Sequence, residues 1–412
     1  MKKSVSLTLG LCMAASLLAA KPSQAGFAVG GENGWQLTTD GIIDVFSTYH
    51  TTTPLRNARS ASYVGGWLDG NGAETNQRFG VGVGLLPSVV AFNIKAPTTN
   101  GVDSTVRIGL YPSIQNADET RFSTGSHLDV REVFYTAKGR YGEILAGRAL
   151  NLYQGKNILT DMTLLTAGTV GPRWSTVTLG HIGYGYLYAN FGPQMRYTTP
   201  EFWDGAKFAI AIAEPYNISG RTDMDKTNIP RIEAELSYAK TFKSGTTVQA
   251  WLSGLYQRAT SREYDTNPQS IGGAYGIGAG FNGIDLLLSG YGGRGLGMLS
   301  AQDGALGSGS VDWTGKERKF YGFLAQATYQ INPTWKLGVN YGQNRLIETD
   351  HDKSMRAARA LAKRQESGVA SITYNMNSFT QFVFEYIHAR DTFTDGAQMR
   401  SNQFAFGTMF YW

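Results

Sequence analysis

The sequence predicts an all-β protein: a transmembrane antiparallel β-barrel of about 16 strands, with about 18 as the alternative. Three features point to this class: an aromatic face on the final segment, a series of segments in which apolar and polar residues alternate, and connections that alternate between short and long. Beyond the N-terminus, no apolar run reaches the ~18–20 residues that a membrane helix needs. Barrel strands alternate between apolar and polar positions, so this observation is compatible with a barrel.

The last residues, Arg400–Trp412, form the clearest alternating segment. Phe404, Phe406, Phe410 and Trp412 share one face, and the other face is smaller and mixed. A soluble protein seldom ends on such a strand, because an exposed apolar edge invites aggregation. In a membrane barrel the aromatic face lies in lipid, and pairing with the first strand removes the edge. An edge strand of a secreted β-sandwich is the alternative for this stretch alone.

The N-terminus predicts export. A basic start and an apolar run, Leu7–Ala20, precede Ser23-Gln24-Ala25, small residues at the spacing of a cleavage site. We therefore expect residues 1–25 to be a signal peptide and residues 26–412 to form one barrel domain. Cys12 is the only cysteine and would leave with the signal peptide, so we expect a mature chain without thiol or disulfide.

Composition excludes several functions. Removal of the signal peptide lowers Lys+Arg from 37 to 34 against 32 acidic residues, and this small excess argues against a nucleic-acid partner. The 51 glycines and 12% aromatics suit many strands joined by turns. The 5 histidines are scattered without the spacing of a catalytic triad or a metal site. We therefore expect neither an enzyme nor a metal or cofactor.

Alternating segments follow one another along the C-terminal two thirds. Pairs of segments meet at short turns such as Asn282-Gly283, a strong hairpin dipeptide, and long connections separate the pairs. This asymmetry is typical of periplasmic and extracellular barrel ends. The predicted strands are Tyr184–Thr199, Ala206–Tyr216, Ile229–Phe242, Thr246–Thr260, Ser270–Asn282, Gly283–Gly297, Arg318–Ile331, Trp335–Gly342, Glu366–Met376 and Phe379–Thr392. In the connection between Trp335–Gly342 and Glu366–Met376, Ser354–Gln365 is expected to form a basic loop helix. A contact of this segment with lipopolysaccharide is the alternative.

The N-terminal part leaves the strand number open. Within Arg78–Ala96, the apolar face switches at Pro87, which indicates a bulge or a turn there. A bulge makes this one strand and gives about 16 in all, which we favour. A turn would need another strand, such as Ser62–Leu68, and gives about 18. The other strands expected here are Trp35–Tyr49, Val102–Gln115, Leu128–Lys138 and Gly142–Arg148.

The longest connection, Ala149–Gly183, is expected to determine what the barrel can do, because it would narrow the lumen. A barrel of this size holds a water-filled lumen that its own side chains cannot fill. The connection contains five glycines and the apolar run Met162–Ala167. A loop that long and apolar is poorly suited to water, so we expect it to fold into the lumen and narrow it.

Short motifs resemble the Gram-negative general (trimeric) porin family. Arg131–Arg148 is similar to that family's Arg-led strand, Gly-containing turn and Gly-Arg ending before the constriction loop, and Arg78-Phe79-Gly80 is similar to its Arg-containing second strand. The ending resembles the family's C-terminal signature, with Trp412 where Phe is usual. The resemblance implies an outer-membrane homotrimer, and a wall cluster of Arg78, Arg131 and Arg148 that faces the constriction.

The resemblance also places Asp161 at the loop tip, because Thr160-Asp161-Met162 is similar to the start of the family's tip. The Pro-Glu-Phe-Gly-Gly segment that follows in enterobacterial porins is absent. Independently of the resemblance, Arg107 and Arg196 lie on the polar parity of their strands and would extend a basic path, as would Arg231. Arginines with few opposing carboxylates raise the local anion concentration in a narrow aqueous passage.

We therefore expect a water-filled channel for passive diffusion of small hydrophilic solutes and ions, with modest anion preference. Outer-membrane lipid, lipopolysaccharide and two further copies of the chain are the expected partners. A channel specific for sugars or organic acids is the alternative, with Trp174, Tyr184, Tyr186 and Tyr188 as a stacking track for ring-shaped solutes. An outer-membrane enzyme and a secreted adhesin are less favoured.

Overall fold

The chain forms a closed, antiparallel barrel of 16 strands with almost no helix. The computed structural model describes residues 27–68, 76–114, 128–168, 179–218, 224–226, 229–261, 267–300 and 309–412. The predicted signal peptide, 1–25, lies outside the described residues. Among the described residues, no helix is long and apolar enough to cross a membrane.

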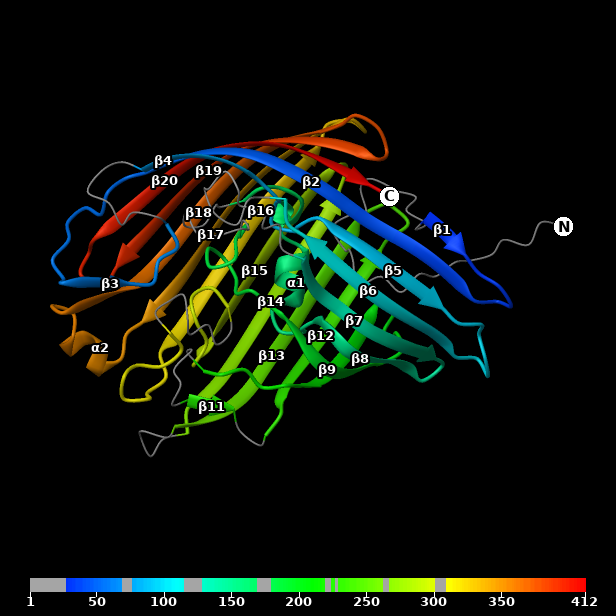
Figure 1. The fold of residues 1–412 in the computed structure, drawn as a ribbon, viewed down its shortest axis with the longest axis horizontal. Coiled ribbons are helices and arrows are strands. Elements are labelled where there is room, and N and C mark those ends of the chain that lie inside the picture. Colours follow the sequence, from blue (N-terminus) through cyan, green and yellow to red (C-terminus); the bar gives the residue numbers. More distant parts are fainter. Residues whose placement is uncertain are drawn as a thin grey trace.

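Each barrel strand pairs with the next in the chain, and β20 pairs with β2 to close the ring (Figure 1). Three short strands extend the barrel ends without joining the ring: β1 (Phe27–Gly30) on β2, β3 (Ser62–Val64) parallel to β18, and β11 (Met224–Lys226) on β13. The barrel strands are β2 (Gln36–Thr52), β4 (Asn76–Gly82) with β5 (Val89–Lys95), β6 (Asp103–Pro112), β7 (Leu128–Gly139), β8 (Gly142–Leu150), β9 (Phe191–Thr198), β10 (Ala206–Ala213), β12 (Arg231–Thr241), β13 (Thr247–Ser261), β14 (Gln269–Phe281), β15 (Ile284–Arg294), β16 (Lys319–Gln330), β17 (Trp335–Ile347), β18 (Arg359–Asn375), β19 (Thr380–Phe393) and β20 (Gln398–Tyr411).

The interruption around Pro87 is a bulge, which confirms the favoured strand number. Both β4 and β5 pair with β2, so they are two halves of one barrel strand. Asp44 of β2 bridges the break, because it accepts a hydrogen bond from the Gly84 amide and one from the Ser88 hydroxyl at 2.8 Å. Ser62–Val64, considered above as part of an additional strand, instead pairs with β18 outside the ring.

The outer face is apolar and the inner face is not, as the alternation predicts. In β20, Phe404, Phe406 and Phe410 are each about half exposed, whereas Ala405 between them is buried. Aromatic side chains also gather at the barrel end with the short turns, where the Trp335 and Tyr374 rings lie 4.7 Å apart. These outward rings form the girdle expected where a barrel meets the membrane interface.

Two predicted elements differ from the structure. The strand predicted to begin at Tyr184 begins at Phe191, because residues 184–190 lie inside the lumen. The basic segment predicted as a loop helix contains only the end of α2 (Asp350–Ser354), and from Arg359 onward it is strand β18. Pairing with β3, β17 and β19 outweighs the local helix propensity of this segment.

Asp395 joins two extracellular loops. It lies between β19 and β20, and its carboxylate accepts hydrogen bonds from the Ser60 hydroxyl (3.0 Å) and the Tyr63 hydroxyl (2.6 Å). Burial raises the pKa of this carboxyl, but the hydrogen bonds from Tyr63 and from nearby amides lower it by more, so its pKa lies below the ordinary value. The contact holds the loop after β2 against the barrel end.

Candidate constriction site

The chain turns into the lumen directly after β8. Residues 151–168 and 179–190, here called the infolded segment, contain α1 (Gly155–Leu159) and the 3-10 helix η1 (Met162–Leu165). The start of the infolded segment is held by Glu233 of β12, which accepts hydrogen bonds from the amides of Leu152 (2.8 Å) and Tyr153 (3.0 Å). Figure 1 shows α1 inside the ring of strands. The predicted inward fold of this connection is therefore confirmed, and it extends to Asn190 rather than to Gly183.

The infolded segment is bonded to walls on several sides of the lumen. The break between β4 and β5 leaves the amides of Leu85 and Leu86 without strand partners, and they donate to the carbonyls of Thr166 and Leu164, both at 3.1 Å. Three strands further round the wall, Glu385 of β19 accepts from the Thr166 hydroxyl (2.8 Å) and the Gly168 amide (3.0 Å). Further anchors join Trp251 to Asn157, Gln326 to Thr160 and Met162, and Gln403 to Gly168.

Asp161 stabilises the infolded segment from within. Its carboxylate caps η1 by accepting from the Thr163 amide (2.9 Å), and it also accepts from the Thr163 hydroxyl (2.6 Å) and the Tyr186 hydroxyl (2.7 Å). The side chain is buried. Asp161 therefore lies in the segment that narrows the lumen, but these contacts occupy its carboxylate.

Two of the three tyrosines considered as a stacking track are structural. Tyr184 and Tyr186 are fully buried, and Tyr184 donates to Asp391 of β19 at 3.1 Å. A buried ring whose hydroxyl is bonded to a carboxylate presents no face to a passing solute. Trp174 lies outside the described residues.

A charged network covers the inner wall at β2, β6 and β7. Arg107 of β6 donates to Asp40 of β2 (2.9 Å) and to Glu132 of β7 (2.8 Å). Glu132 also accepts from the Tyr111 hydroxyl at 2.8 Å. The Arg107 side chain is 20% exposed and the Asp40 side chain 29% exposed, so the network faces open space.

A β-bulge turns Arg131 into this network. The register between β6 and β7 shifts where Gly109 faces Glu132 and Leu110 faces Val130, which leaves Arg131 as the extra residue. A bulge lets two successive side chains share a face. Arg131 binds Asp129 at 2.7 Å, and its guanidinium lies 5.2 Å from the Tyr111 ring centre.

Charged residues continue this surface toward the infolded segment. Arg196 of β9 donates to Gln194 and to the carbonyl of Leu150. Lys156 of α1 lies 3.7 Å from Glu235 of β12. Lys156 thus brings a cation from the infolded segment to the wall.

The other two predicted arginines lie apart from the network. Arg148 is opposite Val133 in the ladder and is exposed, and Val133 points outward with 45% exposure. Opposite residues share a face, so Arg148 lies on the outer surface rather than in the lumen. Arg78 of β4 faces inward, since it is opposite the buried His50 and next to the outward Phe79.

Sequence reasoning thus located part of the wall network. It identified Arg107, Arg131 and Arg196, and it missed the acids that surround them: Asp40, Asp129, Glu132 and Glu235. Within the ranges that the structure describes, no three His, Cys, Asp or Glu side chains gather as metal ligands would.

The closed 16-strand barrel, the apolar outer face and the infolded segment define an outer-membrane channel for passive diffusion. Residues 8–394 match the family described as Gram-negative porin, and the chain belongs to this family. A comparison with curated proteins finds no match.

Solved outer-membrane barrels share this fold at low sequence identity. The outer-membrane channel DcaP of Acinetobacter baumannii is similar with a TM-score of 0.64 and 13% identity, over 93% of this chain and 99% of that chain. OmpF of Salmonella typhi gives 0.56 and 14% over 92% and 98%. OmpT of Vibrio cholerae gives 0.54 and 12% over 93% and 99%.

Proposed function

We propose that small hydrophilic solutes and ions pass between the infolded segment and the inner wall formed by β5 to β9. The observation that carries this proposal is a difference in burial. Inward side chains beneath the infolded segment are closed off, with Trp251 4% and Glu385 0% exposed. On the other wall, the Arg107 and Arg131 side chains are 20% and 21% exposed. Charged, partly exposed side chains suit an aqueous path in which hydrated solutes diffuse.

Ion preference in this passage would depend on unpaired charge. Two carboxylates offset Arg107 and one offsets Arg131, so these arginines add little net positive potential. Arg78 and Arg196 form no ion pair within the described ranges, and they support the modest anion preference that we propose. We expect the anion preference to be small because Arg107 and Arg131 are paired with carboxylates.

Reversal potentials in a salt gradient test this proposal. We expect the native channel to favour anions weakly, and Arg196→Ala to move the potential toward cations. Arg107→Ala should move it further, because it leaves two carboxylates uncompensated. Arg148→Ala, on the outer face, is the matched control and should leave the potential unchanged. A cation-favouring potential that none of these substitutions alters would refute the assignment of the passage.

A solute-specific channel is the second candidate. The Arg131 guanidinium over the Tyr111 ring, beside Arg107, offers cationic donors and an aromatic edge in one partly exposed place. Such a group would suit an organic acid or a sugar. Block of single-channel current by millimolar solute, lost in Arg131→Ala, would support specificity, and current without block would favour general diffusion.

We further propose that the chain works as a homotrimer embedded in outer-membrane lipid and lipopolysaccharide, and as a channel rather than an enzyme. The family supports the trimer, and the solved OmpT of Vibrio cholerae includes a form described as a trimer. Mass measurement of the detergent-extracted protein by light scattering, corrected for bound detergent, tests the oligomeric state. A monomer under mild extraction would contradict the trimer.

A further inference from the structure

The lumen face of β14 carries only small side chains, and α1 lies against it. Outward apolar residues of this strand alternate with buried inward ones. A Cβ atom added at Gly272 would lie 2.4 Å from the Tyr153 hydroxyl, just before α1. The missing side chains therefore let the start of α1 approach the strand closely. We call the inward residues the dock: Ser270, Gly272, Ala274, Gly276, Gly278 and Gly280.

Few hydrogen bonds hold α1 at the dock. The Trp251 indole N–H of β13 donates to Asn157 at 3.0 Å, and the Lys156 ammonium lies 3.7 Å from Glu235. The Asn157 side-chain nitrogen is buried and finds no hydrogen-bond partner within the described ranges. The same holds for the hydroxyl of Ser253, two residues after Trp251 on the same inward face. Buried polar groups without partners destabilise the arrangement that buries them.

Gln154 is unfavourable in the docked position for two reasons. Its backbone is left-handed, with φ 68° and ψ −3°, a conformation that strains residues other than glycine. Its side chain is fully buried beside the Tyr153 hydroxyl, and among the described residues its amide makes no hydrogen bond to the wall. Movement of α1 away from the dock would relieve both the strain and the burial.

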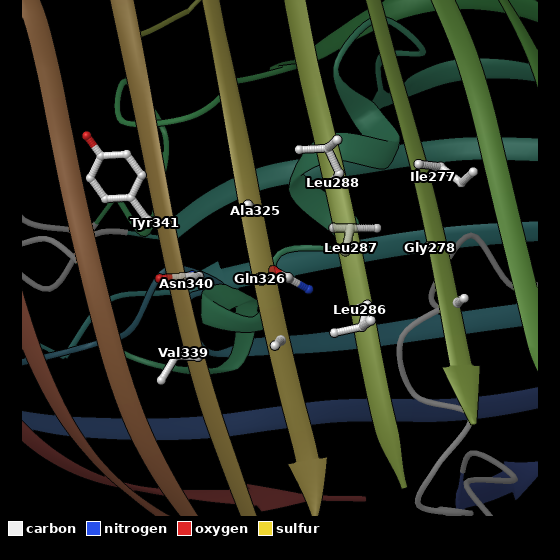
Figure 2. A pocket seen from close by; sticks show the side chains of 12 residues that line it. Ile277, Gly278, Leu286, Leu287, Leu288, Ala325, Gln326, Val339, Asn340 and Tyr341 are labelled. Atoms are coloured by element: carbon white, nitrogen blue, oxygen red, sulfur yellow. The ribbon is translucent and has the colours of Figure 1, made fainter. Parts of the chain in front are cut away.

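Both ends of α1 are fixed more firmly than α1 itself. Before it, Glu233 accepts hydrogen bonds from the Leu152 and Tyr153 amides. After it, Gln326 of β16 donates to the Thr160 carbonyl at 2.8 Å, and residues 161–168 hold the wall contacts described above. Figure 2 shows Gln326 on this wall, with helical turns of the infolded segment behind the strands. Residues 154–160 are thus a weakly held piece between two anchors.

We propose that α1 alternates between the docked position and a released position in the lumen, while residues 161–168 stay in place. In the released position Gln154 leaves the left-handed region, and the buried polar groups meet water. Lys156 moves with α1, and it is the one exposed charged side chain in the described part of the infolded segment.

Release gives the channel a second conducting state of lower conductance, because α1 enters the passage. This inference rests on the proposed passage between the infolded segment and β5 to β9. The dock adjoins that passage, since Glu235 interacts both with Lys156 and with Arg196 of β9.

Cysteine accessibility in the full-length protein tests the release. Cys12 is the only cysteine of the sequence and lies in the predicted signal peptide, so an introduced cysteine is the only thiol of the mature chain. Ser253→Cys places a thiol at a buried position between the strand and α1. Its reaction rate with a water-soluble methanethiosulfonate measures the released fraction. Ser371→Cys is the matched control near η1, because Ser371 and Met162 both flank Gly338.

Substitutions at the dock should change the rate at Ser253→Cys and leave the rate at Ser371→Cys unchanged. Gly272→Ala displaces the Tyr153 hydroxyl and should raise the rate at least about tenfold. Trp251→Phe removes the indole donor without adding volume and should raise it about fivefold. Gln154→Gly relieves the strain and should lower it about fivefold. Gly273→Ala is the control for Gly272→Ala, because a Cβ atom there meets nothing within 4 Å.

Single-channel currents of the same variants test the consequence for conduction. The time spent in the lower-conductance state should change by the same factors as the reaction rate. Equal rates at Ser253→Cys in all variants would overturn the release and leave the proposed passage untouched. Faster reaction with native currents would overturn the second conducting state and also count against the passage. A parallel rise at Ser371→Cys would show that the whole segment moves, which overturns the division at residue 160.

Discussion

Removal of the Glu385 carboxylate should loosen the infolded segment while the barrel stays intact. The Glu385 side chain is fully buried and accepts from the Thr166 hydroxyl (2.8 Å) and the Gly168 amide (3.0 Å). A buried donor left without its acceptor costs about 1–3 kcal/mol, so Glu385→Ala, which leaves two such donors, removes about 2–6 kcal/mol of gross docking free energy. The substitution also removes the cost of burying the carboxyl group. The net loss of docking free energy is therefore expected in the lower half of this range, at about 3 kcal/mol.

Hydrogen exchange measures this loss directly. A change of about 3 kcal/mol corresponds to about 100-fold faster exchange of amides in residues 161–168. The contacts of Leu85, Leu86 and Gln326 remain, so single-channel currents should become noisier without loss of the channel. Glu385→Gln keeps one acceptor oxygen and should show an intermediate effect.

Glu143→Ala, in β8 close to its periplasmic turn, controls for the loss of a wall carboxylate. It should leave exchange in residues 161–168 unchanged. Native exchange rates and native current noise in Glu385→Ala would refute the idea that this carboxylate anchors the infolded segment.

Three further substitutions test other parts of the structure. Phe406→Lys places a charge on the lipid face, where Phe406 is 53% exposed, and should lower the free energy of unfolding by about 2–4 kcal/mol in a reversible refolding titration. Tyr186→Phe removes the 2.7 Å hydrogen bond to Asp161 and should cost about 1–3 kcal/mol, read out as faster exchange in η1. Because the pKa of Asp395 lies below its ordinary 3.8, loop docking should be complete above that pH and weaken as the pH falls through the lowered pKa. Protease cleavage of residues 53–64 against pH measures this, and Asp395→Asn should abolish the pH step.

Periodicity in the sequence determined most of the barrel. The outward aromatics of β20, the turn at Asn282-Gly283 and the bulge near Pro87 each depend on local backbone preference and alternation. The inward fold of the segment after β8 was also predictable, because an apolar segment of that length is costly to leave in water.

Only the tertiary structure decided which charged residues meet. Arg131 and Glu132 are neighbours that alternation would place on opposite faces, and a bulge with β6 brings both inward. Arg148 has the sequence context of a constriction residue, yet its register with Val133 places it outside. Which carboxylate offsets Arg107 also depends on register, because Asp40 lies on β2 to one side of β6 and Glu132 lies on β7 to the other side. Alternation is a property of one strand, whereas register and bulges are properties of strand pairs, and the charge of the passage follows from the pairs.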